Sequence, residues 1–409
     1  MLTRALVDLT PLRTCPPFRR LWLGRLCSGF GFQMTLVAVM FQVWSQTRST
    51  VWTGAVGLAQ ALPLIVFGLF AGSLVDRADR RKIALAATAG QTVCSVLLAV
   101  QGFIGGVPVA AVLGLVAVQS GFFALGGPAG RTFVPRLLPP EQLAAGLALG
   151  RIAFQGAMLL GPALGGLVLG RFGVGGCYVV DALTFGMAFY GLFGLPEMRP
   201  GGEPARAGVR GVLDGLAFLV RTPVVRGALL TDLAATVLSM PLSLFPLVNA
   251  ERFDGDPRTL GLFMSAVAAG GVAASVFSGA FTRRLRPGRV MLAGSAAWGV
   301  ALAGFGLAPG PWLSLACLVV AGAADTVSVV SRGALVQLAT PDVLLGRVAA
   351  AEQIVGQAGP DVGNLRGGLV AGATSGTFAL VSGGVLCVAA VVAVGAATPG
   401  LRRFTTPAR

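Results

Sequence analysis

The sequence predicts an all-α membrane protein of about twelve transmembrane helices in two six-helix halves. Three observations predict this class: the composition, a series of long apolar stretches and an internal repeat. Of the 409 residues, 55% are hydrophobic and 11% are charged, and the mean hydropathy is +0.81. A soluble domain carries roughly 25% charged residues, so the chain falls outside that class.

Composition also narrows the function. The chain contains no histidine, and its 6 cysteines are scattered without a CxxC pair, so we expect neither a metal site nor a disulfide framework. The formal net charge is +15. The basic residues come in short clusters between apolar stretches and not along one surface stripe, so we expect no nucleic-acid partner. The basic N-terminus leads into a stretch too long for a cleavable signal peptide.

The apolar stretches define the expected spans. A helix needs about 20 residues to cross the hydrocarbon layer. Roughly twelve stretches are long enough, near residues 22–45, 51–74, 83–104, 108–130, 143–170, 173–194, 226–250, 259–282, 289–308, 311–336, 347–374 and 376–398.

The distribution of cations predicts the orientation. Most of the 31 Lys and Arg residues lie on one side of the membrane: before the first span, after the last span, or in every second connection between spans. Arg332 and Arg347 belong to this group. Arg48, Arg171, Arg252 and Arg258 lie on the other side, and Arg151 and Arg366 lie within spans. Short cytoplasmic loops are rich in Lys and Arg, so both termini are expected in the cytoplasm and the chain in the cell membrane.

One long polar segment, from Pro196 to Pro223, separates the halves. We therefore predict a six-helix bundle over 1–195, a cytoplasmic linker over 196–225 and a second bundle over 226–409. Apolar residues recur at helical spacing in the linker, at Val209, Val212, Leu213, Leu216 and Leu219. This pattern predicts a short amphipathic helix lying on the inner leaflet.

The internal repeat supports the division. The segment Arg131–Leu143 aligns without gaps with Arg332–Leu344, and the run from Gly161-Pro162 to Gly165 aligns with the run from Gly359-Pro360 to Gly363. Chance alignment of short Gly- and Pro-rich pieces is the alternative. Two repeated six-helix halves are a transporter architecture whose binding site lies between the halves.

The loop after the second span carries a specific motif. It reads Gly72-Ser-Leu74-Val-Asp76-Arg77-Ala-Asp79-Arg80-Arg81-Lys82. This resembles the G-x-L-x-D-R-x-G-R-[RK] signature of the major facilitator superfamily at the position where that family carries it. The resemblance implies a cytoplasmic latch formed by Gly72, Asp76, Arg77, Arg80 and Arg81. Asp79 departs from the signature, which usually has Gly there.

Other segments resemble the branch that contains enterobactin exporters and macrolide-efflux proteins. They are Phe18-Arg-Arg-Leu-Trp22, Asp181-Ala-Leu-Thr-Phe185 and the segment from Arg131 to Leu143. The resemblance implies a monomeric secondary transporter that exports a small amphiphilic solute by alternating access, with protons as the coupling ion and no bound cofactor. The Arg that many drug:proton antiporters carry in the fourth span is missing, which leaves the coupling mechanism open.

Comparison of the halves singles out the eleventh span. Ala163, Gly166 and Val168 of the fifth span correspond to Asp361, Asn364 and Arg366. Charged groups within a membrane are costly, so such residues usually face a cavity or a partner. Gln353, Gln357, Asp361 and Asn364 form one helical stripe, and Gly161-Pro162 and Gly359-Pro360 are predicted helix breaks. The alternative is a structural role, either as an Asp361–Arg366 pair or through separate pairings to neighbouring helices. Positions five apart face each other poorly on a straight helix, which favours partners elsewhere.

The remaining acids are ranked below Asp361. Asp325 is predicted near mid-depth of the tenth span, on one face with Ser328 and Arg332. Glu352 lies about one turn into the eleventh span. Asp181 and Asp232 are predicted nearer the membrane faces, where a structural role and a functional one are both open. Arg25 and Gln33 in the first span are weaker candidates.

The sequence also bears on three other function classes. A facilitator or importer of a polar metabolite would show every feature described above, so this class stays open as the alternative. An enzyme is disfavoured because no HExxH, nucleophile motif or phosphate loop occurs. A sensor or scaffold built on a transporter fold is disfavoured because no appended soluble domain would transmit a signal.

Overall fold

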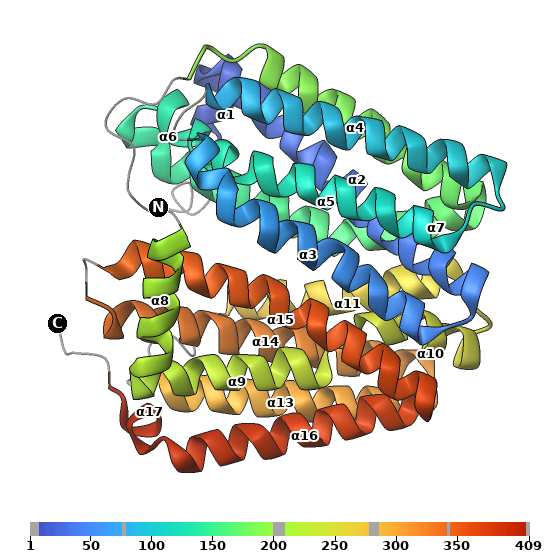
Figure 1. Ribbon diagram of the computed structural model, residues 1–409, viewed down its shortest axis with the longest axis vertical. Helices are drawn as coiled ribbons and strands as arrows, with labels where there is room; N and C mark the ends of the chain where they lie inside the picture. Colours follow the sequence, from blue (N-terminus) through green and yellow to red (C-terminus); the bar gives the residue numbers. More distant parts are fainter. Residues whose placement is uncertain (1–7, 76–78, 199–208, 278–285, 342–343, 406–409) are drawn as a thin grey trace. The chain divides into compact units, whose positions relative to one another are not determined.

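The computed structural model describes residues 8–75, 79–198, 209–277, 286–341 and 344–405. These residues form helices joined by short connections, and the described part contains no β-strand (Figure 1). In chain order the helices are α1 (Thr10–Thr14), α2 (Pro16–Thr47), α3 (Thr50–Val75), α4 (Arg80–Ile104), α5 (Val109–Arg131), α6 (Phe133–Leu137), α7 (Pro140–Phe193), α8 (Val209–Arg221), α9 (Pro223–Ser239), η2 (Leu242–Leu244), α10 (Phe245–Arg252), α11 (Pro257–Val276), α13 (Pro287–Leu307), α14 (Pro311–Ala339), α15 (Leu345–Ala373), α16 (Gly376–Ala397) and α17 (Pro399–Arg403).

Ten of the described helices are long and apolar enough to cross a membrane. One of them, α7, has 54 residues and is interrupted at Gly173, whose φ of 68° and ψ of −173° are not helical. Glycine adopts positive φ without a steric penalty. An unbroken helix of that length would measure about 80 Å, so α7 supplies two crossings. The 29-residue α15 is also long enough, but its charged residues lower its hydropathy. The expected number of about twelve crossings agrees with this arrangement.

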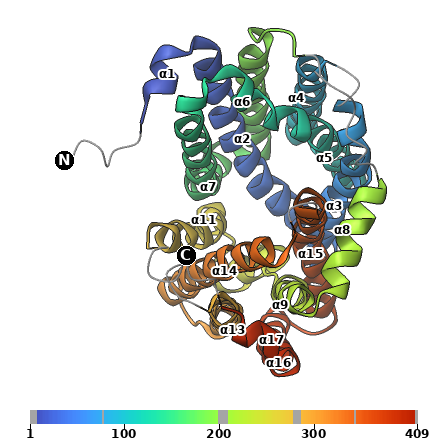
Figure 2. The same cartoon turned by 90° about the vertical axis from the view of Figure 1, so that its left-hand side faces the viewer.

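The chain divides into two compact units. Unit 1 comprises Met1–Gln42 and Leu62–Arg206, and unit 2 comprises Val43–Ala61 and Ala207–Arg409. The division runs through α2 and α3, so the connection between these two helices groups with unit 2. The sequence places that connection in the first half. Figure 2 views the helices of each unit nearly end-on.

Unit 1 is held together by apolar contacts at the ends of its helices. Leu21, Ala84, Ala129, Phe133 and Leu192 belong to one buried cluster, which Leu195 and Met198 complete. A second cluster consists of Phe18, Val134, Leu138 and Leu149. Because α2, α4, α5 and α7 contribute to these clusters, their apolar faces fix the bundle in which the polar groups described below lie.

Unit 2 depends on close packing through small residues. A Cβ on Gly270 of α11 would overlap the backbone oxygen of Val319 on α14, and a Cβ on Gly322 would overlap that of Val267. The two glycines therefore allow α11 and α14 to approach each other from both sides. Small residues that admit close backbone contact are typical of helix association in membranes.

The predicted amphipathic helix is present as α8, but its apolar face meets protein. Leu219 is buried in a cluster with Val225, Val348 and Leu401, and Leu216 and Phe218 pack against that cluster. α8 contacts α9 and α15. The expectation of a helix whose apolar face rests on the inner leaflet is corrected on this point, because part of that face is taken up by the core of unit 2.

The helix breaks differ from those expected. α7 continues through Pro162 and α15 continues through Pro360, so these prolines do not end a helix. The seventh span is interrupted instead. α9 ends at Ser239, and Met240 is extended at φ −63° and ψ 124°. Pro241 disfavours helical geometry at the residue before it, which explains the break.

Candidate functional site

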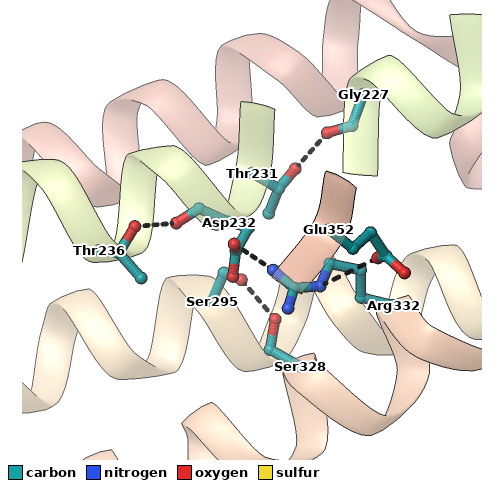
Figure 3. A network of polar contacts seen from close by, with 8 residues as sticks. All are labelled: Gly227, Thr231, Asp232, Thr236, Ser295, Ser328, Arg332 and Glu352. Carbon is teal, nitrogen blue, oxygen red and sulfur yellow. Dashed lines mark hydrogen bonds and ion pairs between the residues drawn. The ribbon is translucent and has the colours of Figure 1, made fainter. Parts of the chain in front are cut away.

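A cluster of charged side chains lies inside unit 2 (Figure 3). Arg332 of α14 pairs with Asp232 of α9, and its Nε lies 3.8 Å from Oε1 of Glu352 on α15. The three side chains are 15%, 12% and 22% exposed, respectively. Three helices thus meet through one guanidinium. Removal of either partner of such a pair destabilises the fold, because the charge that remains is left buried and unpaired.

This cluster corrects two expectations. Arg332 was counted among the cytoplasmic loop cations, but it lies within α14, about two turns before the end of that helix. Asp232 was expected nearer a membrane face with its role open, whereas it is the ion-pair partner of Arg332. Asp325 precedes Arg332 by two turns on the same helix, and Ser328 between them lies with its Oγ 2.7 Å from Oγ of Ser295 on α13.

Two of the predicted site residues, Asn364 and Arg366, form hydrogen bonds on either side of the break after α9. Asn364 Oδ1 accepts a hydrogen bond from the Ser243 N–H at 3.1 Å, and Ser243 Oγ donates to the Asn364 backbone oxygen at 2.7 Å. Arg366 donates to the backbone oxygen of Leu238 in the last turn of α9. A cation is favourable at a helix C-terminus. These contacts give Asn364 and Arg366 a role in holding the interrupted span.

Asp361 lies on the side of α15 that faces the first half of α3. A Cβ on Gly57 would lie 3.1 Å from the Asp361 backbone oxygen and 3.2 Å from its Oδ1. A Cβ on Gly54 would lie 2.9 Å from the Asn364 backbone oxygen, and Thr50 Oγ1 donates to the Gly368 backbone oxygen at 2.7 Å. We call this contact between residues 50–57 and 361–368, all within unit 2, the α3–α15 seam.

Asp361 and Arg366 do not form an ion pair. Arg366 is bound to Leu238, and among the described residues Asp361 has neither a hydrogen bond nor an ion pair from its side chain. Of the expected polar stripe, Asp361 Oδ1 lies near Gly57 of α3, whereas the Asn364 side chain is bound to the Ser243 N–H. The side chains of Gln353 and Gln357 lie outside the described residues. Gly359 packs against Thr236, whose Oγ1 would lie 2.7 Å from a Cβ at that position.

The latch motif is described in part, within unit 1. Asp76 and Arg77 lie outside the described residues, and Gly72 lies near the end of α3. Arg80 begins α4 and donates its N–H to the Met198 backbone oxygen at 3.2 Å. Arg81 Nη2 donates to the Phe193 backbone oxygen at 2.5 Å. Both arginines therefore attach the start of α4 to the end of α7 and the segment that follows it.

Asp79, the departure from the family signature, takes part in the same attachment. Its Oδ1 accepts the Arg81 N–H at 2.9 Å, which caps α4, and the Met198 N–H at 3.1 Å. Partial burial raises the pKa of the Asp79 carboxyl, but the N–H groups of Met198 and Arg81 and the charges of Lys82 and Arg81 outweigh it and hold the pKa below its usual range.

The remaining first-half candidates serve packing or belong to a buried network. Gly161 lets α7 approach α2, because a Cβ there would lie 2.6 Å from Gln33 Cβ. Arg25 Nη2 donates to the Gly130 backbone oxygen at 2.5 Å. Asp181 is 0% exposed and lies about two turns after the Gly173 break. It is therefore well inside its helix, which corrects the expectation of a place near a membrane face.

Four residues that sequence reasoning passed over complete these sites. Ser95 and Gln119 contact Asp181, and Thr53 Oγ1 donates to the Ser243 backbone oxygen at 2.9 Å. Ser243 follows Pro241 in an otherwise apolar span. Pro241 lies at this break, but Pro162 and Pro360 lie inside continuous helices, so a proline alone does not identify a break in the sequence. Isolated Ser, Thr and Gln residues in a helix do not indicate which neighbouring helix they contact.

The described residues contain no group of three or more His, Cys, Asp or Glu side chains that could hold a metal ion. What the described polar groups can do is bind ions, protons and polar parts of a solute inside helix bundles.

Comparison with known proteins decides the family. Residues 7–402 match the model of the family described as transmembrane secretion effector. The chain belongs to this family of major facilitator superfamily transporters. It is therefore a multi-pass membrane transporter for a small-molecule substrate and not an enzyme.

Named relatives and solved structures agree with this assignment. The chain is 29% identical over 415 residues to "Enterobactin exporter EntS" of Escherichia coli O1:K1 / APEC, covering 98% of this chain and 96% of that protein. The same figures hold for "Enterobactin exporter EntS" of Shigella boydii serotype 18. The fold resembles a bacterial homologue of the iron transporter ferroportin, with a TM-score of 0.68 and 16% identity over 95% of this chain and 99% of that chain. It also resembles a peptide transporter POT mutant in complex with alafosfalin, with a TM-score of 0.78 and 12% identity over 96% of each chain.

Proposed function

We propose that this transporter exports a siderophore-like amphiphilic solute and that proton entry drives the export. The observation that carries the substrate class is the alignment over 98% of the chain with exporters of enterobactin. We further propose that it works as a monomer with both termini in the cytoplasm and that it has no nucleic-acid partner.

Asp361 is the proposed coupling acid. It lies in the α3–α15 seam, its side chain has no hydrogen bond or ion pair among the described residues, and Arg366 is engaged elsewhere. A carboxyl without a fixed partner can gain and lose a proton as access changes from one side of the membrane to the other. Asp232 and Glu352 are less suited, because both are tied to Arg332.

The energetics of this proposal are sufficient. Moving one charge through 100 mV releases about 2.3 kcal/mol. Since about 1.4 kcal/mol corresponds to a factor of ten, one proton per cycle sustains a solute gradient of roughly 50-fold.

The test uses everted membrane vesicles, in which export appears as uptake. We expect labelled enterobactin to accumulate when the vesicle interior is acidified and the accumulation to collapse when a protonophore is added. Vesicles without the protein are the control. Uptake that equilibrates without accumulation would identify a facilitator, and accumulation only in right-side-out vesicles would identify an importer.

A further inference from the structure

The Asp181 carboxyl lies at the meeting point of four helices of unit 1. Ser95 of α4 and Gln119 of α5 form hydrogen bonds to the carboxyl of Asp181, which belongs to α7. α2 packs on the carboxyl at Gly31, and its Thr35 hydroxyl faces Asp181. Exposure is 0% for Asp181 and Ser95, 4% for Thr35 and 5% for Gln119. The carboxyl is therefore shut off from solvent by neutral polar groups.

The two carboxyl oxygens have different surroundings. Oδ2 receives the Ser95 hydroxyl at 2.6 Å and the Gln119 Nε2 at 3.3 Å, and Gln119 Nε2 also donates to Ser95 Oγ at 2.9 Å. Oδ1 has no hydrogen-bond partner among the described residues, and neither has the buried Thr35 hydroxyl. A Cβ on Gly31 of α2 would lie 2.7 Å from Oδ1. This oxygen is thus covered by the α2 backbone.

Among the residues that the structure describes, no cation forms an ion pair with the Asp181 carboxyl. The titratable groups that interact with Asp181 are Cys177 and Tyr178 of its own helix. The side chains that face it from α2, α4 and α5 are the neutral Thr35, Ser95 and Gln119. The Tyr178 hydroxyl is engaged with Gln42 Oε1 at 2.7 Å. An ionised carboxylate without a cation in such surroundings costs several kcal/mol.

We propose that Asp181 is a proton-binding site, with the proton on Oδ1 and directed to the Thr35 hydroxyl. One hydrogen bond, from the protonated Oδ1 of Asp181 to Oγ1 of Thr35, then gives both oxygens a partner. The carboxyl is neutral in this state. Loss of the proton to water leaves an anion directly beneath the α2 backbone at Gly31. Occupancy of the site is thereby linked to the packing of α2 against α7. This site is separate from the acids of unit 2, and its occupancy does not depend on the direction or the substrate of transport.

Infrared difference spectroscopy on the purified protein in lipid nanodiscs tests the proposal without any substrate. We expect the wild type at neutral pH to show the carbonyl band of a protonated carboxyl and to shift that band to lower frequency in heavy water. Asp181→Asn should lose the band. Asp8→Asn, which alters an exposed carboxyl, is the matched control and should keep it.

A second variant reports on the proton's position. Thr35→Val removes the acceptor but keeps the shape, so the band should remain and move to higher frequency. Identical spectra of the wild type and Asp181→Asn in the carbonyl region of protonated carboxyls overturn the proposal, because a band that both proteins share belongs to another acid. Stabilisation of the wild type by sodium chloride but not by an equal concentration of choline chloride, with no response in Asp181→Asn, would assign the site to sodium instead. Should Asp181→Asn fail to fold, an unmoved band in Thr35→Val contradicts the proposal equally.

Discussion

At the scale of single residues, the acids of unit 2 differ in what surrounds them. Asp232 and Glu352 share one guanidinium, whereas Asp361 faces the α3 backbone at Gly57. An ion pair between side chains of different helices ties those helices together. Asp232 and Glu352 therefore connect helices, whereas Asp361 is the acid that we propose for proton exchange.

Asp361→Asn should abolish proton-driven accumulation of the proposed siderophore-like solute and preserve its downhill exchange. Asn keeps the size and the hydrogen-bonding capacity of the side chain but cannot release a proton. The measurement is accumulation against counterflow in the same proteoliposomes. Because Arg366 is bound to Leu238, protein yield should stay at the wild-type level. Full proton-driven accumulation in Asp361→Asn would exclude the residue and make Asp325 the next candidate.

Asp232→Asn should destabilise the protein by about 3 kcal/mol, because it leaves Arg332 with Glu352 at 3.8 Å as its remaining partner. The double variant Asp232→Leu with Arg332→Met should recover most of this loss, since it removes both charges of the pair. Thermal unfolding of the detergent-solubilised protein measures both effects. Asp254→Asn, in a connecting turn, serves as the control. Equal losses in the single and the double variant would show that the ion pair does not carry the stability.

At the scale of elements, two attachments hold helices whose ends lack intrahelical partners. The interrupted span after α9 depends on Asn364 and Arg366 of α15, and the start of α4 depends on Asp79. Each attachment joins segments more than a hundred residues apart. Both are therefore places where one side chain determines how two elements meet.

Asn364→Leu should cost about 1–3 kcal/mol, because the buried Ser243 N–H loses its side-chain acceptor. Asn364→Asp, which keeps an acceptor oxygen at the same place, is the comparison. Hydrogen exchange of the peptide that contains Ser243 measures the effect locally and should be faster in Asn364→Leu. Unchanged exchange in that peptide would mean that the backbone of η2 does not need the contact.

Asp79→Ala should loosen the start of α4 by about 1 kcal/mol, the usual cost of removing an N-cap side chain. The effect should depend on pH with a definite sign. The folded-state pKa of Asp79 lies below its ordinary value, so its charge stabilises the fold above the unfolded-state pKa, and this stabilisation is lost as the pH falls through the folded-state pKa. Hydrogen exchange of the Arg81 amide should therefore differ between wild type and Asp79→Ala at neutral pH and converge in acid. A constant difference at all pH values would contradict the charge-based account.

At the scale of the whole molecule, the described helices account for an even number of crossings. Ten helices of the described part meet the length and apolarity needed for a span, the Gly173 break adds a crossing within α7, and α15 is long enough for one more. Termini on the same side of the membrane follow from an even number.

A reporter fused after Arg409 should therefore be active in the cytoplasm. Green fluorescent protein, which folds in the cytoplasm, and alkaline phosphatase, which needs the periplasm, are fused at this point in two separate fusion proteins. We expect fluorescence without phosphatase activity. Fusions after Gly310, in the turn between α13 and α14, should give the opposite result. Phosphatase activity at Arg409 would require one crossing more or fewer than the helices indicate.

The amino-acid sequence by itself determined the all-α membrane class, the approximate number of crossings and the family. Long apolar stretches, loop cations and the motif from Gly72 to Lys82 are properties of neighbouring residues along the chain, so they can be recognised in the sequence. The tertiary structure decided which partner each polar side chain takes. Arg332 meets Asp232, Asn364 meets Ser243, and Asp181 meets Ser95 across gaps that no local pattern records. It also decided where helices break, because Pro162 and Pro360 are accommodated within continuous helices while Pro241 is not. The physical reason is that the lipid requirement acts on each span separately, whereas hydrogen bonds and ion pairs inside a bundle are chosen by the packing of helices distant in sequence.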